Sequence, residues 1–90
     1  MRRDGNTLVL EGALTMDTVP ELADQAHSLC DEGIDSVDFA AVTTLDSAAI
    51  ALALEIARSS SGRVRFRNLT PAARKLADLY SVADQLALDG

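Results

Sequence analysis

The fold is decided by one stretch of the chain, residues 36–67, with the sequence SVDFAAVTTLDSAAIALALEIARSSSGRVRFR. Its first five residues, 36–40, predict a strand. Residues 63–67 alternate between arginine and apolar side chains, which is typical of a strand with one wet and one buried face. Between them, residues 47–58 predict a helix, because apolar side chains recur there at helical spacing. A helix between two strands indicates a crossover connection, and hence parallel strands.

The residues before this stretch predict two further strands and a helix. Residues 7–11 form a β-rich run that ends at Gly12, and residues 13–16 predict a second strand, joined to the first as a hairpin through a turn at Gly12. A helix follows, which either Asp17 or Thr18 can cap. Its buried face is expected to hold Val19, Leu22, Ala23, Ala26, Leu29 and Cys30.

The remaining residues complete the predicted order of elements. The small polar residues 43–46 predict a turn, and Thr70 with Pro71 opens a third helix as its N-cap and first residue. The order is then β-β-α-β-α-β-α. It predicts an α/β fold in one domain, residues 1–90, with helices packed against a small, largely parallel mixed sheet. On the third helix Ala73, Leu76, Ala77 and Tyr80 are expected to be buried, and Val82, Leu86 and Leu88 to pack a last short turn onto the core.

The composition narrows the classes of function. The 90 residues are 48% apolar but only 3% aromatic, so the core is expected to be aliphatic. Fourteen acidic against eight basic residues give a net charge of −6, which argues against nucleic acid or an anionic membrane surface as a partner. One histidine, His27, and one cysteine, Cys30, exclude a zinc site of Cys and His ligands and an internal disulfide. We therefore expect a cytoplasmic, non-enzymatic binding module with no cofactor or metal and no segment inserted in the membrane.

The predicted helix at residues 47–58 is apolar on two sides. One side suits the core and holds Ala49, Leu52, Ala53 and Ile56. A surface helix should be polar on the opposite side, but that side also carries large aliphatic residues and predicts contact with a partner. The alternative is that a neighbouring helix or the chain terminus covers this outer stripe, which consists of Ser47, Ile50, Ala51, Leu54 and Arg58.

Asp46 and Ser47 precede this helix and allow two interpretations. The simpler one is helix capping, in which Asp46 accepts hydrogen bonds from backbone N–H groups and contributes about 1 kcal/mol. The sharper one makes Ser47 a contact or phosphorylation site. A phosphate there would suit the helix dipole but would add about two negative charges to an apolar docking surface, and so act as a release switch.

The predicted strand at residues 63–67 carries basic side chains. Arg63, Arg65 and Arg67 form a basic stripe on one face of a strand. Since the chain is acidic overall, we expect a solvated face or internal ion pairs there. The sequence also lacks the glycine-rich loops that bind phosphate.

Residues 6–88 resemble a STAS domain, the fold of bacterial anti-sigma factor antagonists and of the cytoplasmic tails of sulfate transporters. The resemblance rests on the opening strand at residues 8–12, the strand Val37-Asp38-Phe39, and Leu45-Asp46-Ser47-Ala48-Ala49-Ile50. The family pattern there is Asp, Ser or Thr, two small residues of which the second is commonly Gly, and an aliphatic residue. Ala49 stands where Gly is usual.

Within the family, the chain is most similar to the STAS subunits of Mla-type phospholipid-transport ABC complexes. The aliphatic helix and the ending Lys75-Leu76-Ala77-Asp78-Leu79-Tyr80-Ser81-Val82 carry this similarity. It implies a non-enzymatic accessory subunit, peripheral to the inner membrane, that binds and stabilises or activates the ATPase and, through it, a membrane permease that maintains outer-membrane lipid asymmetry. The residues it implies at the ATPase contact are Thr44, Asp46, Ser47, Ile50, Ala51 and Leu54.

The alternative implied by the same family is an anti-sigma factor antagonist. Its partner would be an anti-sigma factor kinase, which would phosphorylate Ser47. A small enzyme is a third class, disfavoured because the chain carries so few residues suited to catalysis.

Overall fold

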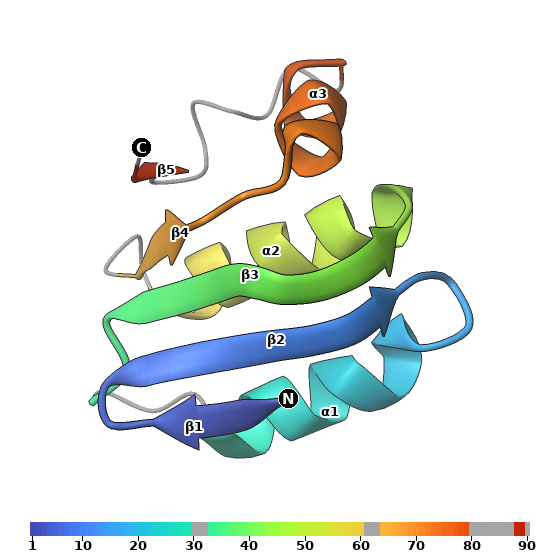
Figure 1. Cartoon of the computed structure of the whole chain (residues 1–90). Coiled ribbons are helices and arrows are strands. Elements are labelled where there is room, and N and C mark those ends of the chain that lie inside the picture. Colours follow the sequence, from blue (N-terminus) through green and yellow to red (C-terminus); the bar gives the residue numbers. More distant parts are fainter. Residues whose placement is uncertain (30–32, 61–63, 80–87, 90) are drawn as a thin grey trace.

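The computed structural model describes residues 1–29, 33–60, 64–79 and 88–89, and these form an α/β fold (Figure 1). The sheet has the strand order β1-β2-β3-β4-β5. β1 is antiparallel to β2, and the other pairs are parallel, so the predicted mixed, largely parallel sheet is confirmed. The elements are β1 (Arg2–Asp4), β2 (Thr7–Leu14), α1 (Val19–Leu29), β3 (Ser36–Leu45), α2 (Ser47–Ser59), β4 (Arg65–Arg67), α3 (Pro71–Leu79) and β5 (Leu88–Asp89).

The core lies between the sheet and the helices. Helices α1 and α2 cover one face of the sheet, and α3 lies beyond its β4 side (Figure 1). Phe39 and Phe66 meet edge to face across β3 and β4, with ring centroids 6.4 Å apart. The other large, fully buried side chains are aliphatic, as the composition predicts: Leu8, Leu10, Leu14, Ile34, Leu52, Val37 and Val64.

The structure has a hairpin at the N-terminus, but its turn lies closer to the start of the chain than predicted. β1 pairs with β2 through a turn at Gly5, whose positive φ of 62° costs glycine nothing. Gly12 also has a positive φ, 74°, but it lies inside β2, where the register with β3 shifts between Gly12 and Ala13. The predicted turn at Gly12 is therefore wrong, because this glycine serves an irregularity within one strand.

β3 is twice as long as predicted and contains two irregularities. It continues to Leu45, so residues 43–45, expected in a turn, belong to the strand. Its ten residues lie beside only eight of β2, with register shifts at Val9/Glu11 and Gly12/Ala13. At the first shift the Oδ1 atom of Asp38 accepts a hydrogen bond of 2.8 Å from the N–H of Ala40.

The predicted helices are found with small changes. α1 starts directly after Thr18, and α3 starts at Pro71, with the N–H of Ala73 donating to Thr70 Oγ1 at 3.1 Å. The expected buried residues Ala26, Ala73 and Ala77 are buried, whereas Leu88 begins a strand instead of a last turn. Half-buried and packed on the core are Val19, Leu22, Ala23, Leu29 and Leu76. Cys30, Arg63, Tyr80, Val82 and Leu86 lie outside the described residues.

Candidate functional site

The start of α2 is held by Asp46, which connects two separate segments of the chain. Asp46 is the N-cap, and its Oδ1 atom accepts a hydrogen bond of 2.8 Å from the N–H of Ala48. Its Oδ2 atom accepts another, of 3.1 Å, from the N–H of Met16 in the loop between β2 and α1. The N–H of Asp46 donates to the carbonyl of Leu14 at 3.1 Å. The predicted capping role is confirmed, and the same carboxylate also fastens the β2–α1 loop to α2.

Thr18 stabilises the β2–α1 loop through hydrogen bonds within the loop. Thr18 Oγ1 accepts a hydrogen bond of 2.9 Å from the N–H of Thr15 and donates one of 2.8 Å to the carbonyl of Ala13. The N–H groups of Thr18 and Val19 donate to the carbonyl of Thr15 at 3.0 and 2.8 Å. The loop is therefore fixed at both ends. It presents Met16, which is 74% exposed, beside the start of α2.

The buried side of α2 is wider than the sequence predicts. The four predicted core positions are buried, but Ile50, predicted on the outer stripe, is only 3% exposed and belongs to the core. α1 lies along the flank of α2 that holds Leu52 and Ile56. Ile50 and Ala57 lie on the opposite flank, and α3 is the described helix that also packs beside α2. Ile50 is therefore not part of an open outer stripe.

A smaller patch remains open, which we call the α2 surface. Ser47, Ala51 and Leu54 follow one side of the helix at i, i+4 and i+7. Ser47 and Ala51 are exposed, and Leu54 is half-buried with its inner part on the core. Thr44 at the end of β3 and Met16 are exposed beside the helix start. Of the residues predicted to bind a partner, Thr44, Ser47, Ala51 and Leu54 lie on this surface, Asp46 is its half-buried cap, and Ile50 is in the core.

The hydroxyl of Ser47 is an accessible polar group at the helix end of the α2 surface. Ser47 follows the N-cap and is exposed, and its side chain forms no hydrogen bond with the rest of the described chain. The neighbouring Asp46 carboxylate is already engaged through both oxygens. Ser47 is therefore placed to contact a partner or to accept a phosphoryl group.

Met16 is the member of the α2 surface that the sequence pattern does not reveal. Residues 13–16 predict a strand, which would place Met16 in a sheet. Instead the strand ends at Leu14, and the hydrogen bonds around Thr18 turn the chain outward. The available signal was an apolar residue in a short polar run, Thr15-Met16-Asp17-Thr18, immediately before a helix.

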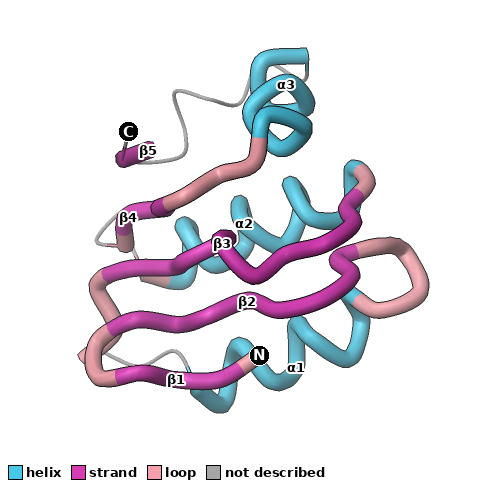
Figure 2. The backbone as a smooth tube through the Cα atoms, in the orientation of Figure 1, coloured by secondary structure: helices cyan, strands magenta, loops and turns pink. Residues whose placement is uncertain are grey.

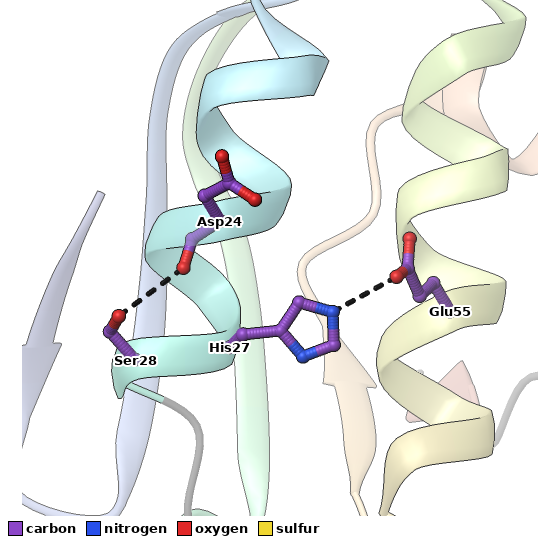
Figure 3. A network of polar contacts seen from close by, with 4 residues as sticks. All are labelled: Asp24, His27, Ser28 and Glu55. Atoms are coloured by element: carbon purple, nitrogen blue, oxygen red, sulfur yellow. Dashed lines mark hydrogen bonds and ion pairs between the residues drawn. The ribbon is translucent and has the colours of Figure 1, made fainter.

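A second group of polar side chains lies between α1 and α2, away from the α2 surface. His27 Nε2 and Glu55 Oε1 are 3.0 Å apart across the two helices, and Ser28 Oγ donates to the carbonyl of Asp24 at 3.4 Å (Figure 3). The pair borders a shallow groove with a volume of about 20 Å³. Both side chains are more than half exposed, so water weakens their interaction. In the described ranges, no three His, Cys, Asp or Glu side chains gather as a metal site would require.

Comparison with known proteins identifies the family. A family model described as Mlab, STAS domain matches residues 1–88. The chain therefore belongs to the STAS domain family. No curated protein matches the chain significantly.

A solved structure has the same fold. The anti-sigma factor antagonist SpoIIAA in its unphosphorylated form is similar over 100% of this chain and 85% of that chain, with a TM-score of 0.67. At 18% sequence identity, this likeness concerns the fold alone. None of the helices in the described ranges has the length and apolar character needed to cross a bilayer.

Proposed function

We propose that this STAS domain is a non-enzymatic accessory subunit that docks through the α2 surface on the ATPase of a Mla-type phospholipid-transporting ABC complex. The domain would then act in the cytoplasm, at the inner membrane, through the ATPase and the permease to which it binds. The ending Leu76-Ala77-Asp78-Leu79-Tyr80, together with the description of the family model, supports this choice within the family.

The observation that carries the proposal is the composition and rigidity of the α2 surface. It combines a free hydroxyl, a small residue and two partly exposed apolar residues: Ser47, Ala51, Leu54 and Met16. Small residues permit close approach of a partner, and the apolar groups gain from leaving water. Because Asp46 holds the helix start and the loop together, little freedom remains to be lost on docking.

The second candidate is an anti-sigma factor antagonist, which the accessible Ser47 hydroxyl favours. A phosphate on Ser47 would lie at the positive end of the α2 dipole, next to the carboxylate of Asp46. It would also place about two negative charges beside Ala51 and Leu54, which opposes apolar docking. This candidate therefore predicts a modified and an unmodified form with different partners.

The test for the first candidate uses the full chain with the Mla-type ATPase of the same organism. Ser47→Arg should abolish co-purification and the chain's effect on ATP hydrolysis, because a large cation would stand in the centre of the α2 surface. Ser59→Arg is the matched control, since Ser59 is exposed at the other end of the same helix. Absence of a complex with wild-type chain, or equal effects of the two variants, would contradict the proposal.

The same purified chain tests the second candidate. Intact mass measurement should show one added phosphate at Ser47 after incubation with an anti-sigma factor kinase, and Ser47→Asp should release that kinase. A kinase complex that forms while the ATPase complex does not would reverse the order of the two candidates.

A further inference from the structure

The outer edge of β3 is paired with a strand over only part of its length. β2 follows β3 on one side from Ser36 to Leu45. On the other side β4 pairs only with residues 36–38, and the chain then turns away toward α3 (Figure 2). Among the described residues, no strand lies beside this edge over residues 39–45.

The separation of β4 from β3 is fixed by Asp38. Its Oδ1 atom accepts from the N–H of Ala40 at 2.8 Å and from Asn68 Nδ2 at 3.0 Å. Asn68 follows β4 directly and has a φ of 57°, a left-handed conformation that asparagine adopts more readily than most residues. The Asp38 carboxylate thus marks the end of the β3–β4 pairing. Beyond it, no described strand pairs with this edge of β3.

The outer edge of β1 and the open part of the β3 edge differ in chemistry. β1 is three residues long, and all three, Arg2, Arg3 and Asp4, are charged, which discourages pairing with another strand. Residues 39–45 of β3 read Phe-Ala-Ala-Val-Thr-Thr-Leu, with no charge and no proline. Only the β3 edge therefore has the length and the residue types that accept an added strand.

A groove lies along this part of β3. Its volume is about 300 Å³, and its walls come from the end of β3 and the start of α3. This volume lies at the lower end of the roughly 300–1,000 Å³ of sites that bind small ligands. On the β3 side its walls are residues 42–45, a length that suits a short extended segment. The lining residues are Val42, Thr43, Thr44, Leu45, Thr70, Pro71 and Ala72.

Basic residues outnumber acidic ones on α3, in an otherwise acidic protein. α3 carries Arg74, Lys75 and Asp78, hence a net charge of +1, whereas the whole chain carries −6. The first turn of α3 has no acidic residue to offset its dipole. Lys75 is exposed four residues after Pro71, so it lies on the same helix face as this lining residue. A segment bound here should carry negative charge near the start of α3.

We propose that the groove binds an extended, acidic segment of a partner protein, which adds to the edge of β3 as a strand. Main-chain hydrogen bonds to residues 39–45 would hold the segment, small or β-branched side chains would fill the groove, and a carboxylate would face Lys75. The site shares Thr44 with the α2 surface, and its other lining residues lie outside that surface. It is therefore an additional interaction site, which does not rest on the proposed function.

The experiment selects random decapeptides displayed on phage against the full-length chain. Enriched peptides should combine β-branched residues with Asp or Glu, and in NMR spectra they should shift the amides of residues 41–45 and 70–75. Ala72→Glu should raise the Kd about tenfold or more, since a like charge enters the groove. Lys75→Ala should raise it less and reduce its dependence on salt.

Two control variants show whether the peptide binds in the groove itself. Gln25→Glu adds the same charge to an exposed residue of α1 outside the groove, and Ser47→Arg alters the α2 surface; both should leave peptide affinity unchanged. Circular dichroism verifies that each variant folds. The proposal is overturned if no peptide is enriched, if the shifts fall on residues 47–54, or if Ala72→Glu and Gln25→Glu act alike. It is also overturned if the wild-type chain covers this edge by forming a dimer.

Discussion

Helices α2 and α3 each start with a side chain that caps them, Asp46 in the first and Thr70 in the second, but they are held to the protein differently. The cap of α2 also bonds the β2–α1 loop through Met16, whereas within the described chain the Thr70 side chain accepts a hydrogen bond from the N–H of Ala73 in its own helix alone. Six residues of α2 are buried, against two small ones, Ala73 and Ala77, in α3. The comparison teaches that α2 contributes to both the core and the candidate site. α3 buries fewer of its side chains and forms one side of the groove beside β3.

The largest effect is expected from the buried flank of α2. Ile50→Ala should lower the free energy of unfolding by about 2–5 kcal/mol, because it leaves a cavity among packed side chains. Leu76→Ala, at a half-buried position of α3, should cost about 1 kcal/mol, since less apolar area is lost. Urea denaturation followed by circular dichroism measures both. Equal costs for the two changes would mean that Ile50 is not the core residue described above.

A smaller difference is expected between the two caps. Asp46→Ala should cost about 1–3 kcal/mol, since it removes a cap and leaves the N–H of Met16 without its acceptor. Thr70→Ala should cost about 1 kcal/mol, the value of a local cap. Amide hydrogen exchange at Met16 should accelerate in the first variant and not in the second. Unchanged protection at Met16 in Asp46→Ala would show that the loop does not depend on this carboxylate.

The smallest effect on stability is expected at the contact between His27 of α1 and Glu55 of α2. A double-mutant cycle of His27→Ala and Glu55→Ala should give a coupling energy below about 1 kcal/mol, because both side chains are largely in water. A larger coupling would show that the ion pair, and not the apolar residues beneath it, fixes α1 against α2.

The sequence predicts well those elements whose side chains follow a regular period. The helix at residues 47–58 is found at Ser47–Ser59, and its four predicted core residues are buried. Thr70 and Pro71 mark the start of α3 as their types predict. In both cases local chemistry and tertiary packing favour the same structure.

The end of β3 could not be predicted from periodicity, because its two extra residues disturb the alternation of a strand. Its core-facing residues are Val37, Phe39, Val42 and Leu45, with spacings of two, three and three instead of two throughout. Residues 43–45 therefore resemble a turn in sequence. Gly12 misleads in the same way, since its positive φ serves the irregularity in β2.

The candidate site could be predicted in part. Ser47, Ala51 and Leu54 follow from the helix pattern, but the pattern of one helix contains no information on what packs beside it, so the prediction for Ile50 is wrong. Met16 lies 31 residues before Ser47 in the chain and reaches the site only through a tertiary hydrogen bond. Contacts of this kind are set by the assembled fold and not by local sequence.

The open β3 edge has a consequence for the protein before it finishes folding. β2 and β3 are separated in the chain by α1 and pair only after the chain between them folds back. Until β4 and α3 have folded, the whole uncharged run from Phe39 to Leu45 is exposed to other unfolded chains. A single lysine in place of Thr43, which is exposed, should therefore raise the yield of refolding at high protein concentration.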